Sequence, residues 1–255
     1  FLISGGLLGS PSSATASNVP TTIASSEGDV LAGYPLYVSQ CARCHGEDGY
    51  GDGAGMDSPT FDALPRNFVA NGEMNATYHF ASTDNAVASD DDLFRVIAEG
   101  LEGSGMPAFP DLTVAQIVSL VDVLNEFRAA GPKPGNAIHV GEAPEATQAS
   151  VTRGADLFAA NCASCHGADG SGNGDQIKYS WRETSPEVFQ IIPAADLVNG
   201  EIKFGASAED IFTRITVGVP GGAAGSELMM SFKTMPVEDR WAIVHYVMEE
   251  VIPSH

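Results

Sequence analysis

Cysteine and basic residues are scarce in this chain of 255 residues. Four cysteines are present, and 12 Lys and Arg stand against 33 Asp and Glu, which gives a formal net charge of −21. So acidic a chain is repelled by nucleic acid and by anionic membrane surfaces, and the charge argues against both as direct partners. The charge favours partner proteins with a basic docking surface, although adaptation to a saline habitat would produce the same acidity.

Long apolar runs and alternating strand patterns are also missing. The last candidate for a membrane span, Trp241 to Ile252, is interrupted by one His and two Glu and is shorter than the roughly 20 apolar residues that cross a bilayer. The sequence therefore predicts no transmembrane helix. Apolar residues make up 44% of the chain, which is enough to build a core, and the apolar residues recur at helical spacing.

The first residues are unlike the rest of the chain. Residues 1–8 are apolar and small, and Ala14-Thr15-Ala16 follows within a stretch rich in Ser and Thr. This pattern is typical of the end of a signal peptide and its cleavage site. We therefore interpret residues 1–27 as an N-terminal extension or a signal-peptide remnant. If the mature protein retains them, we expect a neighbour in a larger assembly to hold them, because a free end of this composition is normally disordered.

The remaining sequence contains the same unit twice. Residues 33–46 follow the pattern Gly-x3-aromatic-x3-Cys-x2-Cys-His-Gly, and residues 154–167 repeat it 121 positions later. Further along, residues 106–109 correspond to residues 229–232 at an offset of 123. So many matches in the same order indicate an internal duplication, with small loop insertions between the matched segments.

The duplication predicts two tandem all-α domains, at residues 28–130 and 151–255. Residues 131–150 lie between them and begin with a run rich in Pro and Gly. Because Pro and Gly interrupt both helix and strand, we interpret this segment as the linker between the domains. Thr113 is expected to cap the last helix of the first domain, with Gln116 completing a capping box. The other helices are expected at Gly28 to Cys44, Ser89 to Glu99, Ser207 to Val217, and along an apolar stripe formed by Trp241, Val244, Val247 and Met248.

Every cysteine belongs to a Cys-x-x-Cys-His motif. The two motifs consist of Cys41, Cys44 and His45, and of Cys162, Cys165 and His166. Two thiols three residues apart on a helical turn can reach the neighbouring vinyl groups of one heme, and the following His then lies beneath the iron. A thioredoxin-like pair needs a βαβ setting, and a zinc site needs four ligands close together. The sequence offers neither context, so it predicts two covalent heme c groups.

Around these motifs the chain resembles the class I cytochrome c family, twice over from about Gly28. Gly33 and Gly154 are similar to the small residues at which the first and last helices of the family cross. Residues 65–68 and 193–197 resemble a loop of bacterial members that serve membrane and periplasmic oxidoreductases. The resemblance implies domains that are small helical bundles wrapped around one heme c each, electron transfer as the function, and His and Met as axial ligands.

The resemblance also indicates which methionines bind iron. Met106 precedes Pro107 and the last helix of the first domain, as the family requires. In the second domain the repeat register favours Met229, although the usual Pro is lost there and Met230 and Met235 remain open alternatives. The expected iron ligands are therefore His45, Met106, His166 and Met229.

One basic residue is a candidate for contact with the heme itself. Arg66 is expected to form a charge-assisted bond with a heme propionate, and an ordinary surface role is equally compatible with the sequence. Its counterpart in the repeat is Ala194, so the two hemes are expected to differ in their propionate contacts.

Three functions fit these features. The leading one is a diheme electron carrier with no substrate chemistry, whose irons are six-coordinate and closed. A diheme peroxidase would need one open or switchable iron, and Met229 without its Pro is the only feature in that direction. A third interpretation, compatible with the first, is a heme-bearing subunit of a respiratory complex or extracellular assembly, docked through residues 1–27. Because heme c is attached after export, we expect a periplasmic or extracellular location, or attachment to the outer face of a membrane.

Overall fold

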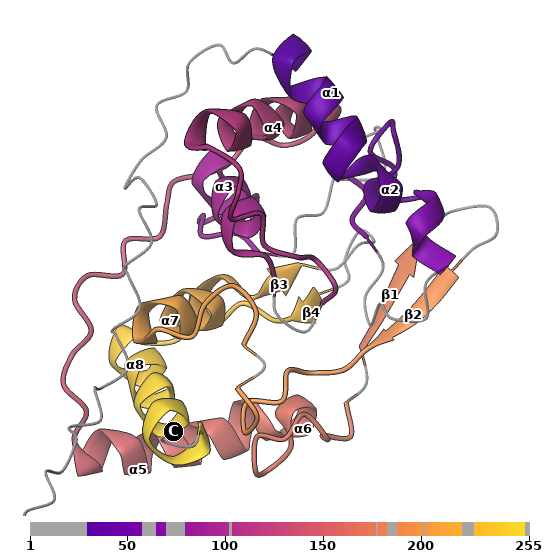
Figure 1. The fold of residues 1–255 in the computed structure, drawn as a ribbon. Coiled ribbons are helices and arrows are strands. Elements are labelled where there is room, and N and C mark those ends of the chain that lie inside the picture. Colours follow the sequence, from indigo (N-terminus) through magenta and orange to yellow (C-terminus); the bar gives the residue numbers. More distant parts are fainter. Residues whose placement is uncertain are drawn as a thin grey trace, which may run out of the picture.

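The computed structural model describes residues 30–57, 65–69, 80–101, 104–176, 178–182, 188–200, 202–220 and 227–252. The N-terminal extension proposed at residues 1–27 lies outside these ranges. The described chain forms two helical domains, one above the other in Figure 1. The prediction of an all-α fold is confirmed, and the longest described helices have 14 residues, so none is long and apolar enough to cross a membrane.

The elements follow the duplication. The first domain contains α1 (Val30–Gln40), α2 (Ala42–His45), α3 (Asp90–Glu99) and α4 (Val114–Phe127), with a 3-10 turn at Ala54–Asp57. The second contains α5 (Gln148–Asn161), α6 (Ala163–His166), α7 (Ala208–Val217) and α8 (Val237–Tyr246), followed by a π-helical turn at Val247–Val251. Two short antiparallel hairpins, which the sequence did not predict, pair β1 (Lys178–Arg182) with β2 (Val188–Ile192) and β3 (Val219–Pro220) with β4 (Glu227–Met229).

The helix starts are set by side chains that cap them. The side chains of Ser89 and Thr113 each accept a hydrogen bond from the backbone amide three residues later. The side chains of Asp92 and Gln116 accept in turn from the amides of Ser89 and Thr113, which completes two capping boxes. Ser207 caps α7 by accepting from the amide of Asp210. The predicted starts of α3, α4 and α7 are therefore confirmed, whereas the predicted first helix divides at Cys41 into α1 and the short α2.

In each domain the first and last helices cross at a glycine, α1 with α4 and α5 with α8 (Figure 1). A Cβ atom at Gly33 would collide with the carbonyl oxygen of Ser119, and one at Gly154 would collide with the carbonyl oxygen of Ala242. Only glycine therefore allows the two backbones to approach this closely. The role predicted for both glycines is confirmed.

The predicted stripe of α8 is only partly right. Trp241, Val244 and Val247 are buried in the second core, but Met248 is 36% exposed. The reason is the π-helical turn that begins at Val247, since its wider turn rotates the following side chains relative to an α-helix. Val251, only 6% exposed, enters the core instead.

The segment between the domains packs against both of them. The amide of Ile138 donates to the carbonyl of Ser82 at 2.7 Å, and the amide of Asp84 donates to the carbonyl of Asn136 at 2.9 Å. Before α5, which begins at Gln148, the carbonyl oxygen of Pro144 lies 3.0 Å from the ring of buried His245. The proposed linker is therefore tied to the first domain at its start and to the second at its end.

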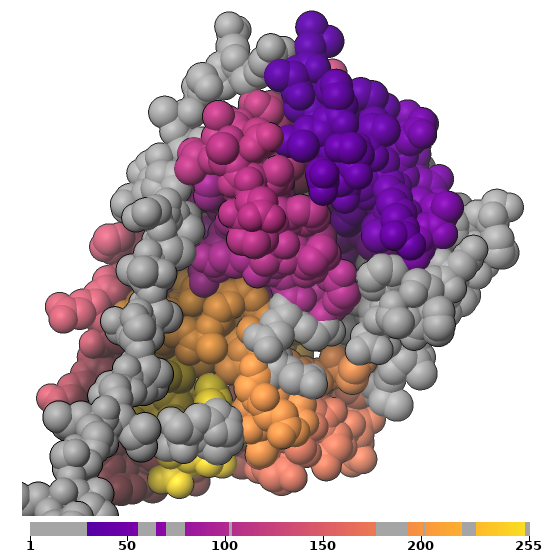
Figure 2. Space-filling model, viewed as in Figure 1, coloured from indigo at the N-terminus to yellow at the C-terminus, as the bar shows by residue number. Residues whose placement is uncertain are grey.

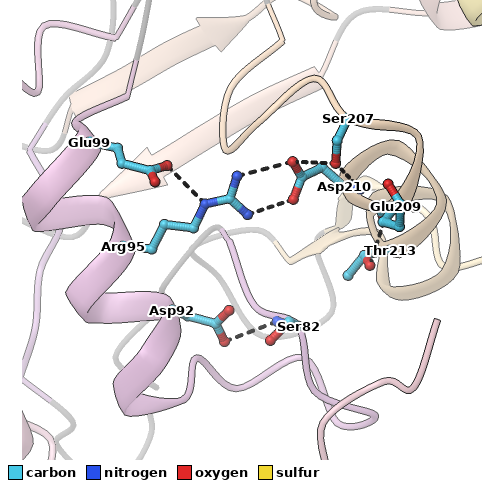
Figure 3. Close-up of polar contacts among 8 residues, drawn as sticks. All are labelled: Ser82, Asp92, Arg95, Glu99, Ser207, Glu209, Asp210 and Thr213. Carbon is cyan, nitrogen blue, oxygen red and sulfur yellow. Dashed lines mark hydrogen bonds and ion pairs between the residues drawn. The ribbon is translucent and has the colours of Figure 1, made fainter. Parts of the chain in front are cut away.

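The domains also meet directly, where α3 faces the start of α7. Arg95 on α3 donates both terminal nitrogens to the carboxylate of Asp210, at 2.5 and 3.0 Å, and its Nε to Glu99 at 2.9 Å (Figure 3). The rings of Phe80 and Phe204 stack beside this pair with centroids 5.6 Å apart. In Figure 2 the magenta surface of the first domain lies against the orange surface of the second. We call these contacts the domain seam.

Candidate heme sites

The two cysteine motifs have the same backbone geometry. The amides of Cys44 and His45 both donate to the carbonyl of Cys41, at 3.1 and 2.9 Å. In the second domain the amides of Cys165 and His166 donate to the carbonyl of Cys162, also at 3.1 and 2.9 Å. Each motif is thus one helical turn that carries two thiols and then an imidazole, as attachment to a single heme requires.

No disulfide joins the two cysteines of either motif, and the surroundings of the first cysteine of each motif do not suit dithiol redox chemistry. Burial, with a smaller effect of the neighbouring Cys44, raises the pKa of Cys41 to about 12. Burial and Cys165 raise the pKa of Cys162 in the same way. Redox-active pairs instead need a lowered thiol pKa. In addition, no group of three or more His, Cys, Asp or Glu within the described ranges could hold a zinc ion.

The orientation of each motif histidine is fixed by a backbone carbonyl. Nδ1 of His45 lies 3.2 Å from the carbonyl oxygen of Arg66, and Nδ1 of His166 lies 3.2 Å from that of Ala195. A carbonyl can only accept, so Nδ1 carries the proton and Nε2 keeps its lone pair for a metal. Burial lowers the pKa of His166, which keeps this imidazole neutral. Both histidines therefore fit an axial ligand of heme iron.

These carbonyls were not identified from the sequence. Arg66 contributes to the first site through its backbone, and the bond of its side chain to a propionate stays a prediction. Its structural counterpart is Ala195, not Ala194 as the sequence pairing had it, because Ala195 supplies the equivalent carbonyl. Any residue can supply a backbone carbonyl, so only the duplication could have drawn attention to the two loops.

The candidate methionines lie in loops with matching backbone contacts. Phe109, three residues after Met106, donates its amide to Ile97 at 3.2 Å, and Phe232, three residues after Met229, donates to Ile215 at 3.0 Å. Gly100 is enclosed by the backbone of residues 106–108, and Gly218 by that of residues 229–231. Met106 and Met229 therefore occupy equivalent positions, and Met230, which is 53% exposed, takes the place of Pro107.

The loop of Met229 is held by a buried arginine that the sequence did not reveal. Arg240 on α8, only 7% exposed, donates to the carbonyl of Met235 at 3.2 Å and to the hydroxyl of Thr216 at 2.5 Å. Ser231 donates its hydroxyl to the carbonyl of Thr216 at 2.7 Å. These bonds connect the loop to α7 and α8 on both sides. The only sequence signal was a basic residue directly before the apolar stripe of the last helix.

Comparison with known families matches each domain separately. The family described as "Cytochrome C oxidase, cbb3-type, subunit III" matches residues 28–122, and the family described as "Cytochrome c" matches residues 151–249. The two matches coincide with the two units of the internal duplication.

Two similar proteins align with this chain over more residues than either domain contains. The Cbb3-type cytochrome c oxidase subunit FixP of Azorhizobium caulinodans is 29% identical over 167 residues, which are 64% of this chain and 48% of that protein. The FixP of Sinorhizobium medicae is 30% identical over 145 residues, 56% of this chain and 41% of that protein. The aligned region therefore spans less than half the length of these relatives.

A solved structure is similar over nearly the whole fold. A chain of the Kuenenia stuttgartiensis reducing HAO-like protein complex Kustc0457/Kustc0458 superposes with a TM-score of 0.74 at 29% identity. The match covers 87% of this chain and 96% of that one, so it includes both domains and their arrangement.

Proposed function

Because the chain is a tandem diheme member of the class I c-type cytochrome family, with one heme c in each domain, we propose that it carries electrons as a subunit of a redox complex outside the cytoplasm. The observation that carries the proposal is the equivalence of the two sites. Each offers two thiols, an imidazole oriented by a carbonyl, and a methionine loop with the same backbone contacts. Heme supplies one-electron chemistry, and the protein sets its potential and position.

The iron ligands that we propose are His45 with Met106 and His166 with Met229. The carbonyl bond of each histidine presents Nε2 to the metal, and the methionine loops are placed alike in both domains. A thioether ligand raises the potential of heme iron and closes its sixth position. With both irons closed in this way, the protein transfers electrons without substrate chemistry.

Membership of a complex is supported by what the similar proteins are called. The curated relatives are named as subunits of an oxidase, and the similar solved chain belongs to an HAO-like complex. The domain seam supports transfer within the chain, because Arg95, Asp210 and the stacked Phe80 and Phe204 hold the two domains in contact. We propose a periplasmic or extracellular location, or attachment to the outer face of a membrane.

The first test is the absorption spectrum of the purified oxidised protein, measured per polypeptide. We expect two low-spin hemes, each with a Met–iron charge-transfer band in the near infrared. A high-spin signal from one heme would show an open iron. That result would overturn the closed carrier and favour an enzyme, such as a peroxidase.

Adjacent methionines provide matched variants for the ligand assignment. Met229→Leu should abolish the charge-transfer band of one heme, whereas Met230→Leu should leave both bands intact because this side chain is largely exposed. Met106→Leu should abolish the band of the other heme. If Met230→Leu or Met235→Leu removed a band and Met229→Leu did not, the proposed ligand would be wrong.

The partner surface can be tested through ionic strength. Net charge of −21 should draw a basic partner by long-range attraction, so electron transfer to that partner should slow as salt is added. Stopped-flow reduction by small cationic and anionic reagents provides the control, since their salt dependences should have opposite signs. A partner rate that is indifferent to salt would refute docking through a basic surface.

A further inference from the structure

Arg214 is a half-buried cation at the domain seam, and its Nη2 atom is fully buried with no acceptor in the described part of the chain. It lies in the last turn of α7, and its Nη1 donates to the carbonyl of Gly218 at 2.9 Å. Its Nη2 is enclosed but has no hydrogen-bond partner in the described structure. A buried donor on a charged group is costly to leave unsatisfied, so this atom points to a missing acceptor.

Aromatic rings from both domains surround the guanidinium. Its central carbon lies 5.0 Å from the ring centre of Phe80 in the first domain and 5.4 Å from that of Phe204 in the second. Such contacts stabilise a cation but accept no N–H hydrogen bond of normal strength. Burial lowers the pKa of Arg214 to about 10, so the group still carries its charge at neutral pH.

The nearby carboxylates bind donors other than Nη2 of Arg214. Asp92 on α3 accepts from the amides of Ser82 and Ser89, at 3.0 and 2.8 Å. Asp210 accepts from both terminal nitrogens of Arg95 (Figure 3). Arg95 is itself a like charge that opposes the cation. The charged groups that face Arg214 are therefore Asp92, Asp210 and Arg95, and none of them accepts from its Nη2.

We propose that the missing acceptor is a heme propionate, and that Nη2 of Arg214 donates a charge-assisted hydrogen bond to it. The inference rests on the proposed function only in that both domains carry heme c. A carboxylate is the anion that a guanidinium binds best, and each heme brings two of them. Arg214 is thus a positioning residue that ties one heme to the domain seam.

If Arg66 binds a propionate of the first heme as predicted, the duplication leaves the second domain without an equivalent residue. The loop that supplies the carbonyl to the motif histidine carries Arg66 in the first domain but Ala195 in the second. In the corresponding helices, Asp92 matches Asp210, so Val96 stands where the second domain has Arg214. The heme of the second domain is therefore the expected recipient, and the heme of the first is the alternative source of the same carboxylate.

The test compares resonance Raman spectra and redox titrations of the intact diheme protein with those of Arg214→Gln. We expect the propionate-bending band of one heme to move and the midpoint potential of that heme to fall, because an unpaired propionate charge favours ferric iron. Met106→Leu and Met229→Leu assign the affected step to a domain, since each displaces the potential of its own heme.

Two further variants separate this bond from other effects. Arg214→Lys keeps the charge but not the fork of donors, so the Raman band should move while the potential falls less. Arg95→Gln removes the same charge at the same seam and should leave both propionate bands in place, because its acceptors are protein carboxylates. Should Arg214→Gln fail to fold, Arg214→Lys decides the question alone.

The outcomes are distinct from those of the proposed function. Propionate bands that stay unchanged in both Arg214 variants would overturn the inference, as would an equal shift in Arg95→Gln, which would show a disturbed seam only. Failure of the closed-carrier proposal would already appear in the unaltered protein, as a high-spin heme or a missing Met–iron band.

Discussion

The two domains hold equivalent sites with different residues. In the first domain the tyrosine hydroxyl of Tyr37 donates to the carbonyl of Gly46, directly after the heme motif, at 2.7 Å. In the second domain the same place is taken by Phe158, which has no hydroxyl. The methionine loop shows the reverse asymmetry, since Pro107 stiffens the first and the bonds of Arg240 tie down the second. The backbone geometry is thus the shared requirement, and each domain meets it by its own means.

The largest expected effect tests what the domains have in common. Gly33→Ala and Gly154→Ala should each lower the free energy of unfolding of their own domain by about 1–3 kcal/mol or more, because the new methyl group meets a backbone carbonyl that cannot move alone. Chemical denaturation, followed through the Met–iron band of each heme, would measure this. Ala159→Ser on the exposed face of α5 is the control. A loss in only one domain would mean that the helix crossings are not equivalent.

The next effect should appear in the second domain alone. Arg240→Leu removes the donors to Met235 and Thr216, so the loop of Met229 should loosen and the affected domain should lose about 1–3 kcal/mol of stability. The Met–iron band of one heme should weaken at a lower temperature than in the unaltered protein.

Pro107→Ala is the matched change in the first domain, and it should weaken the other band. If Arg240→Leu left the thermal stability of both bands unchanged, Arg240 would not hold the ligand loop.

The helical framework follows from the sequence because its determinants are local. Ser89 and Thr113 begin their helices through bonds to residues three positions on. The glycine at each helix crossing recurs at the same place in the duplicated unit, so the repeat indicates where the first and last helices contact each other. Arg240 could not be predicted in the same way, since its acceptors lie on a loop and on another helix. The π-helical turn at Val247–Val251 depends on how α8 meets the second core, and it displaced Met248 from the predicted stripe.

A smaller effect would make the first domain resemble the second. Tyr37→Phe removes one buried hydrogen bond and keeps the ring, so the first domain should lose about 1 kcal/mol of stability. The reverse change, Phe158→Tyr, should stabilise the second domain only if the carbonyl of Gly167 accepts the new hydroxyl. Denaturation curves of both variants would decide this, and a cost well below that of one hydrogen bond in Tyr37→Phe would show that the hydroxyl contributes little.

The smallest effect concerns the ion pair between the domains. Burial alone would raise the pKa of Asp210, but the bonds from Arg95 and Ser207 outweigh it and leave this pKa below its ordinary value. The pair therefore stabilises the seam above the ordinary carboxyl pKa of about 3.9, and its contribution is lost as pH falls through the lower pKa of the folded state.

Because both side chains are partly exposed, a double-mutant cycle of Arg95→Gln and Asp210→Asn should give a coupling free energy of no more than about 1 kcal/mol at neutral pH. The coupling should shrink with added salt and vanish in acid. A destabilisation by Arg95→Gln alone that persisted below the folded pKa of Asp210 would mean that Arg95 also holds the seam through the ring of Phe204, 4.9 Å from its guanidinium.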